Sequence, residues 1–317
     1  MINSTLQKMK QFKYFSFLMF ASLFTLSITS CDKEDAVDDP KSIVEVASSD
    51  NQFSTLVSAL TKAELTSTLE SDGPFTVFAP NNTAFANAGI TDLSGLSKDD
   101  LMPILTSHVI ADEIMSDEVT SGKASTVNDN NDIYISVNSQ GVFINGNIKV
   151  IQTDVDASNG VIHVIDNVIV PPSKSLVEIA LDDPNFSELV SLVQAADPAV
   201  VAALSNASED GLTVFAPTNA AFEKLYQTTP KSTLTDPANR ALLTSVLLYH
   251  VVPGRVFSPD LLNITAPVAT AESTTVAFDL NGGAKVVGKT SGNSNITAAN
   301  ILATNGVIHV IDTVLLP

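Results

Sequence analysis

The residues best suited to chemistry are four histidines, and they occupy matched positions in two halves of the chain. His108 corresponds to His250, and His163 corresponds to His309. Two imidazoles in each half could bind a metal ion or transfer protons. A zinc site needs further ligands, and no matched Cys, Asp or Glu completes either pair. The alternative is structural, with His108, His163 and His309 locking helix to strand through hydrogen bonds.

Hydrolytic chemistry lacks the residues it needs. Asp166 lies three residues after His163, which on a strand is the opposite face. No G-x-S-x-G stretch supplies a nucleophile. We therefore expect no catalytic residue, no cofactor and no enzymatic activity, and a hydrolase or metal-dependent enzyme is the minor alternative.

A calcium loop is suggested by Asp154, Asp156 and Ser158, which resemble the first ligands of an EF-hand. The closing position, eleven residues after Asp154, is Ile165 instead of Glu. We interpret this stretch as a turn rich in Asn and Asp, and we predict no metal site.

An exact octet, NGVIHVID, is present at Asn159–Asp166 and again at Asn305–Asp312. Asn-Gly favours a turn, and the β-branched run after it favours a strand. Both faces of that strand are mostly apolar, so it should be central and covered on both sides. A repeat of this length predicts two homologous units, each closed by its own octet.

The match extends well beyond the octet. The offset between matched residues grows in steps from 133 to 146, which indicates short insertions in surface loops of the second copy. The matched blocks before the octets are Ser42–Leu60 with Ser175–Val193, and Thr76–Phe85 with Thr213–Phe222.

The elements that should position these residues come in a consistent order. An apolar stripe at Phe53, Leu56, Val57 and Leu60 predicts a helix. A strand at 75–78 and a second helix at 99–108, or 240–250 in the second copy, follow. Several short β-rich runs then precede the octet. Helices followed by strands indicate an α+β fold.

The boxes TVFAP-x-N-x-AF and NGVIHVID resemble the two signature boxes of the fasciclin-type adhesion domain, here present twice. The resemblance covers 41–317 and implies two tandem domains, 41–171 and 172–317. Each is expected to be a wedge of about seven β-strands packed with a helical layer. The family implies adhesion or matrix contact at a cell surface, without catalysis.

The resemblance also implies partner-binding residues. In animal relatives, integrin-binding motifs lie at an Asp-Ile pair before the second box and at a Tyr-His pair on the preceding helix. The first pair corresponds to Asp154-Val155 and Asn300-Ile301, and the second is intact only as Tyr249-His250. The candidate contact residues are Asp154, Val155, Asn300, Ile301, Tyr249 and His250.

The amino-terminal segment 1–30 is expected to be a lipoprotein signal peptide. Three lysines precede an apolar stretch too short to span a membrane. The stretch ends at Ile28-Thr29-Ser30-Cys31, which resembles a bacterial lipobox. Cys31 is the only cysteine, so we predict that it carries lipid. The alternative is an ordinary signal peptide followed by a chance cysteine.

An acidic tether is expected at 31–40. Its CDKED start resembles the export signal of Bacteroidetes-type surface lipoproteins, whereas in enterobacteria an Asp after the cysteine resembles a retention signal. We expect a lipid-anchored protein of the bacterial outer membrane, exposed at the cell surface, with a periplasm-facing protein as the alternative.

Charge narrows the choice of partners. Without residues 1–30 the chain carries 13 Lys and Arg against 35 Asp and Glu, a net charge of −22. Such a chain repels nucleic acid and should meet the membrane only through its lipid. The expected partner is a surface protein or an extracellular polysaccharide or matrix. The function predicted is surface-anchored, non-enzymatic adhesion, and a cell-envelope polysaccharide-binding lipoprotein is the alternative.

Overall fold

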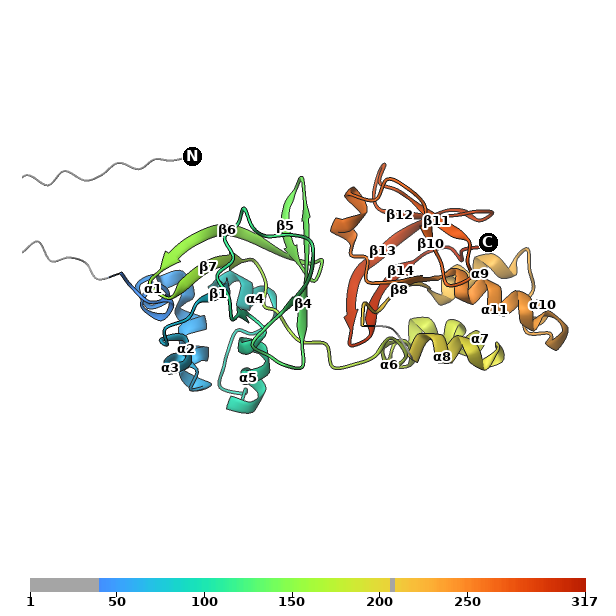
Figure 1. Ribbon diagram of the computed structural model, residues 1–317. Helices are drawn as coiled ribbons and strands as arrows, with labels where there is room; N and C mark the ends of the chain where they lie inside the picture. Colours follow the sequence, from blue (N-terminus) through green and yellow to red (C-terminus); the bar gives the residue numbers. More distant parts are fainter. Residues whose placement is uncertain (1–39, 206–208) are drawn as a thin grey trace, which may run out of the picture. The chain divides into compact units, whose positions relative to one another are not determined.

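The computed structural model describes residues 40–205 and 209–317. The predicted signal peptide, most of the acidic tether and Cys31 lie outside these residues. Pro40–Pro317 forms one compact unit. Within it two domains follow each other along the chain, each with a seven-stranded sheet and helices (Figure 1).

In the first domain the helices come before most of the strands. The helices are α1 (Ile43–Ser49), the 3-10 turn η1 (Asn51–Phe53), α2 (Ser54–Lys62), α3 (Thr66–Leu69), α4 (Asn82–Asn87) and α5 (Lys98–Thr106). The strands are β1 (Phe75–Pro80), β2 (Val109–Ile110), β3 (Gly122–Ser125), β4 (Asp132–Asn138), β5 (Gly141–Ile144), β6 (Ile148–Ala157) and β7 (Gly160–Ile165). The sheet order is β2-β1-β7-β6-β5-β4-β3.

The second domain repeats this order with a longer helical part. Its helices are α6 (Leu176–Asp182), η2 (Pro184–Phe186), α7 (Ser187–Ala195), α8 (Pro198–Ser205), α9 (Asn219–Tyr226), α10 (Lys231–Leu234), η3 (Pro237–Asn239), α11 (Arg240–Tyr249) and η4 (Ser258–Leu262). Its strands are β8 (Leu212–Pro217), β9 (Val251–Pro253), β10 (Val268–Ala269), β11 (Thr275–Asp279), β12 (Lys285–Gly288), β13 (Gly292–Ala303) and β14 (Gly306–Ile311). The sheet order is β10-β11-β12-β13-β14-β8-β9.

The octet forms the central strand of each sheet. β7 runs parallel to β1 and antiparallel to β6, and every residue of β7 is buried. β14 has the same two kinds of neighbour, β8 and β13, and the same burial. The expectation of a strand covered on both faces is confirmed, and so is the α+β fold with two tandem seven-stranded domains.

Each sheet separates two apolar cores. In the first domain Ile162 and Val164 of β7 pack with the helices, while Ile165 packs with residues of β4 and β5. The second domain has the same division, with Ile308 on the helical side and Ile311 on the other. The octet histidine points to the same face as Ile165 or Ile311, because alternate residues of a strand share a face.

The helix expected over the first apolar stripe begins as a 3-10 turn, and a separate short helix, α1, precedes it. α1 begins with a capping box between Ser42 and Glu45, and ends at Ser49. Asp50 then accepts a hydrogen bond from the main-chain N–H of Gln52 and caps η1, which leads into α2. Asp50 therefore has two roles: it is the C-cap of α1 and the N-cap of the 3-10 turn that follows.

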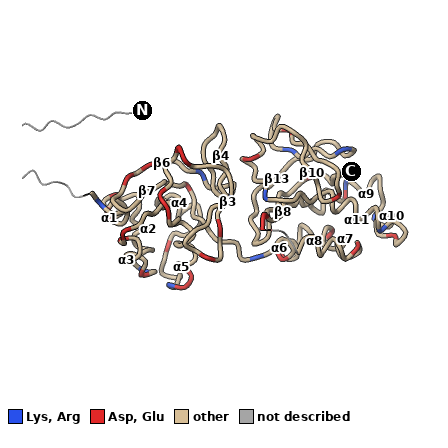
Figure 2. The backbone as a smooth tube through the Cα atoms, in the orientation of Figure 1, with Lys and Arg blue, Asp and Glu red and all other residues tan. Residues whose placement is uncertain are grey.

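Among the described residues, no single helix is long and apolar enough to cross a membrane. The bent pair Pro184–Ala195 and Pro198–Ser205 meets that criterion only when its two parts are taken together. In Figure 2 acidic residues are spread over both domains, and basic residues are fewer.

Candidate functional site

The histidines at the ends of α5 and α11 have both ring nitrogens occupied. The main-chain N–H of Ile169 donates to Nε2 of His108 at 2.9 Å, and Nδ1 of His108 donates to the carbonyl of Ile104 at 2.8 Å. His250 repeats this pattern with Leu315 and Val246 at the same distances. Burial lowers the pKa of both His108 and His250 to about 4, so both rings are neutral near pH 7.

The octet histidines hold the other proton tautomer. Nε2 of His163 donates to the carbonyl of Ile114 at 2.9 Å, and its Nδ1 accepts from the main-chain N–H of Asp154 at 3.2 Å. His309 pairs in the same way with Val256 and Asn300. Burial lowers the pKa of His309 as well.

These contacts leave no histidine nitrogen directed at a substrate or metal. Each ring joins its own strand or helix end to a segment distant in sequence. Within 40–205 and 209–317, no three His, Cys, Asp or Glu side chains come together as a metal site. A structural role for His108, His163 and His309 stays a prediction that stability measurements on variants can test.

Asp154 and Asn300 occupy a β-bulge at the same place in each domain. The pairing of β6 with β7 shifts register before Val155, and that of β13 with β14 shifts before Ile301. The extra residue adopts a positive φ, 57° at Asp154 and 61° at Asn300. Asp and Asn tolerate this left-handed conformation better than most residues.

In each domain the bulge side chain bonds to a serine that follows the second strand: Ser116 after β2 and Ser258 after β9. The Asp154 carboxylate accepts from both the main-chain N–H and the hydroxyl of Ser116, and these bonds lower its pKa. Asn300 accepts from the main-chain N–H of Ser258 at 2.8 Å, and its amide N–H groups reach Ser258 Oγ and the Gly146 carbonyl. Asn300 is buried, whereas Asp154 is half-buried.

The other predicted contact residues have side chains that point into the protein. Val155 and Ile301 are half-buried and pack against the helical cores. Tyr249 is fully buried, and its hydroxyl donates to the Thr275 carbonyl and accepts from the Lys289 N–H. Neither Tyr249 nor His250 presents its side chain to solvent.

Two pairs of polar residues have a role that the sequence analysis missed. The Asn159 side chain accepts from the N–H of Ile43 at the start of α1 and donates to the Leu69 carbonyl. Asn305 makes the same bonds to Leu176 and Leu204. The hydroxyls of Thr76 and Thr213 each bridge two main-chain groups of the loop that bonds the octet histidine. Their recurrence in both copies was the available signal.

An exposed strand edge lies beside the first bulge. The pairing of β5 with β6 ends at Lys149, so the described part of the chain pairs Val150–Ala157 on one side only. We define the β6 edge strip as Ile151, Gln152, Thr153 and Asp156, all exposed, with Ile151 50% exposed. An unpaired edge with an exposed apolar side chain is a template for contact with another chain.

These features together define a class of protein. It has two domains, and in each the His and Asn of the octet form hydrogen bonds inside the domain around the octet strand. The fasciclin domain family model matches residues 51–171 and 184–317. The chain therefore belongs to the fasciclin-domain family, and proteins of this family are in general non-enzymatic proteins of adhesion and extracellular-matrix interaction.

The chain is similar to a cyanobacterial protein and to animal proteins. Protein sll1483 of Synechocystis sp. is 42% identical over 156 residues, which cover 48% of this chain and 86% of that protein. Transforming growth factor-beta-induced protein ig-h3 of Sus scrofa is 31% identical over 256 residues, or 78% of this chain and 35% of that one. Human periostin is 28% identical over 284 residues, with 88% and 32% covered.

The chain spans only about a third of the length of these two animal relatives. Among solved structures, the FAS1 domain pair of the insect cell adhesion molecule Fasciclin I is similar, with a TM-score of 0.44 and 22% identity. That match covers 84% of this chain and 97% of the insect one.

Proposed function

We propose that this protein is a surface-tethered, non-enzymatic adhesion protein that uses the β6 edge strip for contact. The observation that carries the proposal is the unpaired edge of β6 with Ile151 exposed upon it. The signature histidines and asparagines are bonded inside the domains, so they do not compete as contact residues. Family membership supports the adhesive function.

The expected partner is a surface protein or extracellular matrix component. A strand edge recognises an extended protein segment through main-chain hydrogen bonds, while side chains such as Ile151 give specificity. The second domain has a similar stretch, because the pairing of β13 with β12 ends at Asn295 and Thr297 and Ala298 are exposed. Two weak contacts on one chain raise avidity if both can engage.

An attachment assay tests this function. Cells without the protein should adhere less to a surface, a matrix or neighbouring cells, and added soluble protein should compete for the attachment of wild-type cells. Competition by an isolated envelope polysaccharide, but by no surface protein, would support the polysaccharide-binding alternative. Unchanged attachment after deletion, together with substrate turnover that requires His108 or His163, would contradict the adhesion proposal.

The tether is proposed to be lipid on Cys31, followed by the acidic segment 31–40. Cys31→Ser should move the protein from the membrane fraction to the soluble fraction, because a protein with one acyl-bearing residue loses its anchor with it. Protease treatment of intact cells then distinguishes the faces of the outer membrane: a surface-exposed protein is cleaved and a periplasm-facing one is protected. A Cys31→Ser protein that stays in the membrane fraction would refute the lipid anchor.

A further inference from the structure

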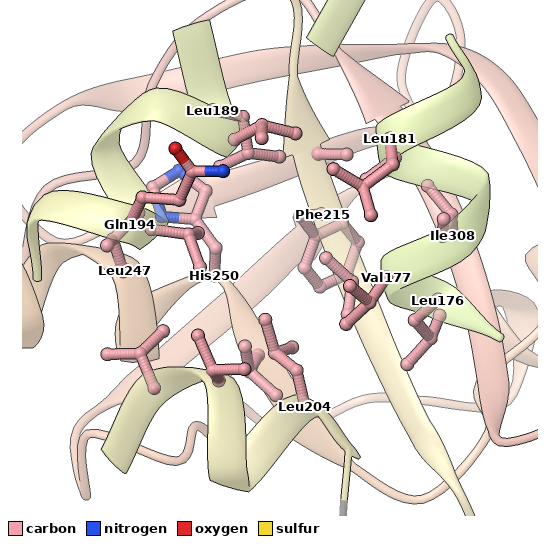
Figure 3. Close-up of a pocket in the computed structure, with 18 residues that line it drawn as sticks. Leu176, Val177, Leu181, Leu189, Gln194, Leu204, Phe215, Leu247, His250 and Ile308 are labelled. Atoms are coloured by element: carbon pink, nitrogen blue, oxygen red, sulfur yellow. The ribbon is translucent and has the colours of Figure 1, made fainter. Parts of the chain in front are cut away.

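The second domain contains an apolar cavity of about 220 Å³ between its helices and its sheet. α6, α7 and α8 surround it, and β8 and β14 form its floor. Figure 3 shows Val177, Leu189 and Leu204 around this space, from α6, α7 and α8. Protein interiors are packed like organic crystals, so a space of this size is a distinct feature.

The lining offers almost no polar group to a ligand inside the cavity. Of its 18 residues only Gln194 and His250 are polar. Both nitrogens of His250 are already bonded to the main chain. Gln194 is exposed at the side of α7, so its amide can reach a polar group at the opening.

The same place in the first domain is filled. The residues matched to Val177, Ala180, Val193 and Leu204 are Val44, Ala47, Leu60 and Leu69, which are all buried. In the second domain the four counterparts are only half-buried. Two changes account for this: Val193 is one methylene smaller than Leu60, and α8 has eight residues where α3 has four.

The opening carries exposed apolar side chains. Leu181 is 58% exposed and Val201 is 39% exposed, and both also line the cavity. From Ser175 to Ser205 the chain has five acidic residues and no Lys or Arg, but Asp182 and Glu188 are paired with Lys174 and Lys231. None of the 18 lining residues is Lys or Arg, so an anionic head group would find no cationic partner in the cavity, whereas an uncharged one needs none.

We propose that this cavity is a binding site for one unbranched aliphatic chain with an uncharged polar head group. The chain enters between α6 and α8, its methylenes replace the missing packing, and its head group stays at the opening near Gln194. An apolar cavity of comparable size, about 150 Å³, takes up small apolar molecules. This inference is independent of the adhesion proposal, because it concerns the helical side of the second domain, whereas that proposal concerns strand edges.

A titration of the purified protein with 1-octanol, 1-hexanol and octanoate tests the proposal. 1-Octanol should bind saturably with one site. 1-Hexanol should bind roughly 15-fold more weakly, because each buried methylene contributes about fourfold to affinity. Octanoate should bind more weakly than 1-octanol, because its carboxylate would lose water and find no Lys or Arg among the lining residues. Absence of 1-octanol binding, or equal affinity for all three probes, would overturn the proposal.

Variants locate the site. Val193→Phe should fill the cavity, abolish 1-octanol binding and leave the protein folded with an equal or higher thermal midpoint. Leu262→Phe, an exposed position in η4, should bind as the original protein does. If Val193→Phe does not fold, Val193→Leu tests the location instead. This variant introduces the side chain that the first domain has at the matched position, Leu60, and should weaken 1-octanol binding. Unchanged binding in a folded Val193 variant would refute this location.

Discussion

At the scale of single residues, the four histidines use both ring nitrogens to bond main-chain groups of separate segments of the fold. Each donates from one nitrogen and accepts at the other, and such paired groups cost free energy when a partner is lost. A protonated ring can no longer accept from the N–H of Ile169 or Leu315. The folded state therefore favours the neutral form of His108 in the first domain and of His250 in the second.

This preference predicts a pH dependence of stability. The pKa of His108 and of His250 is about 4 when folded and near 6.5 when unfolded. A lowered folded pKa gives stability that is complete above pH 6.5 and is lost as pH falls towards 4. The loss should be on the order of 3 kcal/mol per histidine, measured by denaturant unfolding across this window.

The matched variant for this measurement is His108→Gln with His250→Gln. It should be less stable than the original protein at pH 7, because an N–H acceptor is lost in each domain. Its stability should also change less between pH 6.5 and 4. A variant as sensitive to acid as the original protein in this window would show that other groups cause the effect.

At the scale of elements, the Asn-Gly turn at the start of each octet brings two strands unusually close. Gly160 has φ +146°, and a Cβ there would lie 1.9 Å from the carbonyl oxygen of Phe75. Gly160→Ala should therefore destabilise the first domain by about 3 kcal/mol or more. Gly89→Ala is the control, because Gly89 has φ +74° but open space around it, and its cost should be about 1 kcal/mol. Equal losses in chemical denaturation would contradict this explanation.

The order of elements could be predicted from the sequence, because apolar spacing and the two copies support each other. The Phe53–Leu60 stripe, the strand before Pro80 and the octet strand are all found. The β-bulge at Asp154 could not be predicted, since it depends on how β6 pairs with β7. The cavity depends on a one-methylene difference and on the length of α8, which periodicity does not resolve.

The candidate contact residues were also predictable only in part. Their chain positions followed from the family resemblance, but their exposure depends on tertiary packing. Tyr249 ends an apolar helix whose inner face cannot be distinguished by composition alone. Its hydroxyl bonds to Thr275 at the start of β11 and to Lys289 just after β12, both distant in sequence. Ile151, by contrast, is an ordinary strand residue in the sequence, and it is exposed because within 40–205 and 209–317 the pairing of β5 with β6 ends at Lys149.

At the scale of the whole molecule, a hydrogen-bonded interior is distinct from an exposed strand edge. The residues shared by both copies hold helices, sheet and loops together, while the residues proposed to meet a partner differ between the copies. Ile151, Gln152 and Thr153 are matched by Thr297, Ala298 and Ala299. The two domains would then share a fold and differ in what they contact.

The most direct measurement compares attachment supported by two variants at equal surface abundance. Ile151→Asp changes the exposed edge and should keep the unfolding midpoint of the original protein while attachment falls. His309→Gln changes the interior and should lower the midpoint while attachment persists well below that temperature. Full attachment with Ile151→Asp, together with lost attachment in a folded His309→Gln protein, would contradict the account.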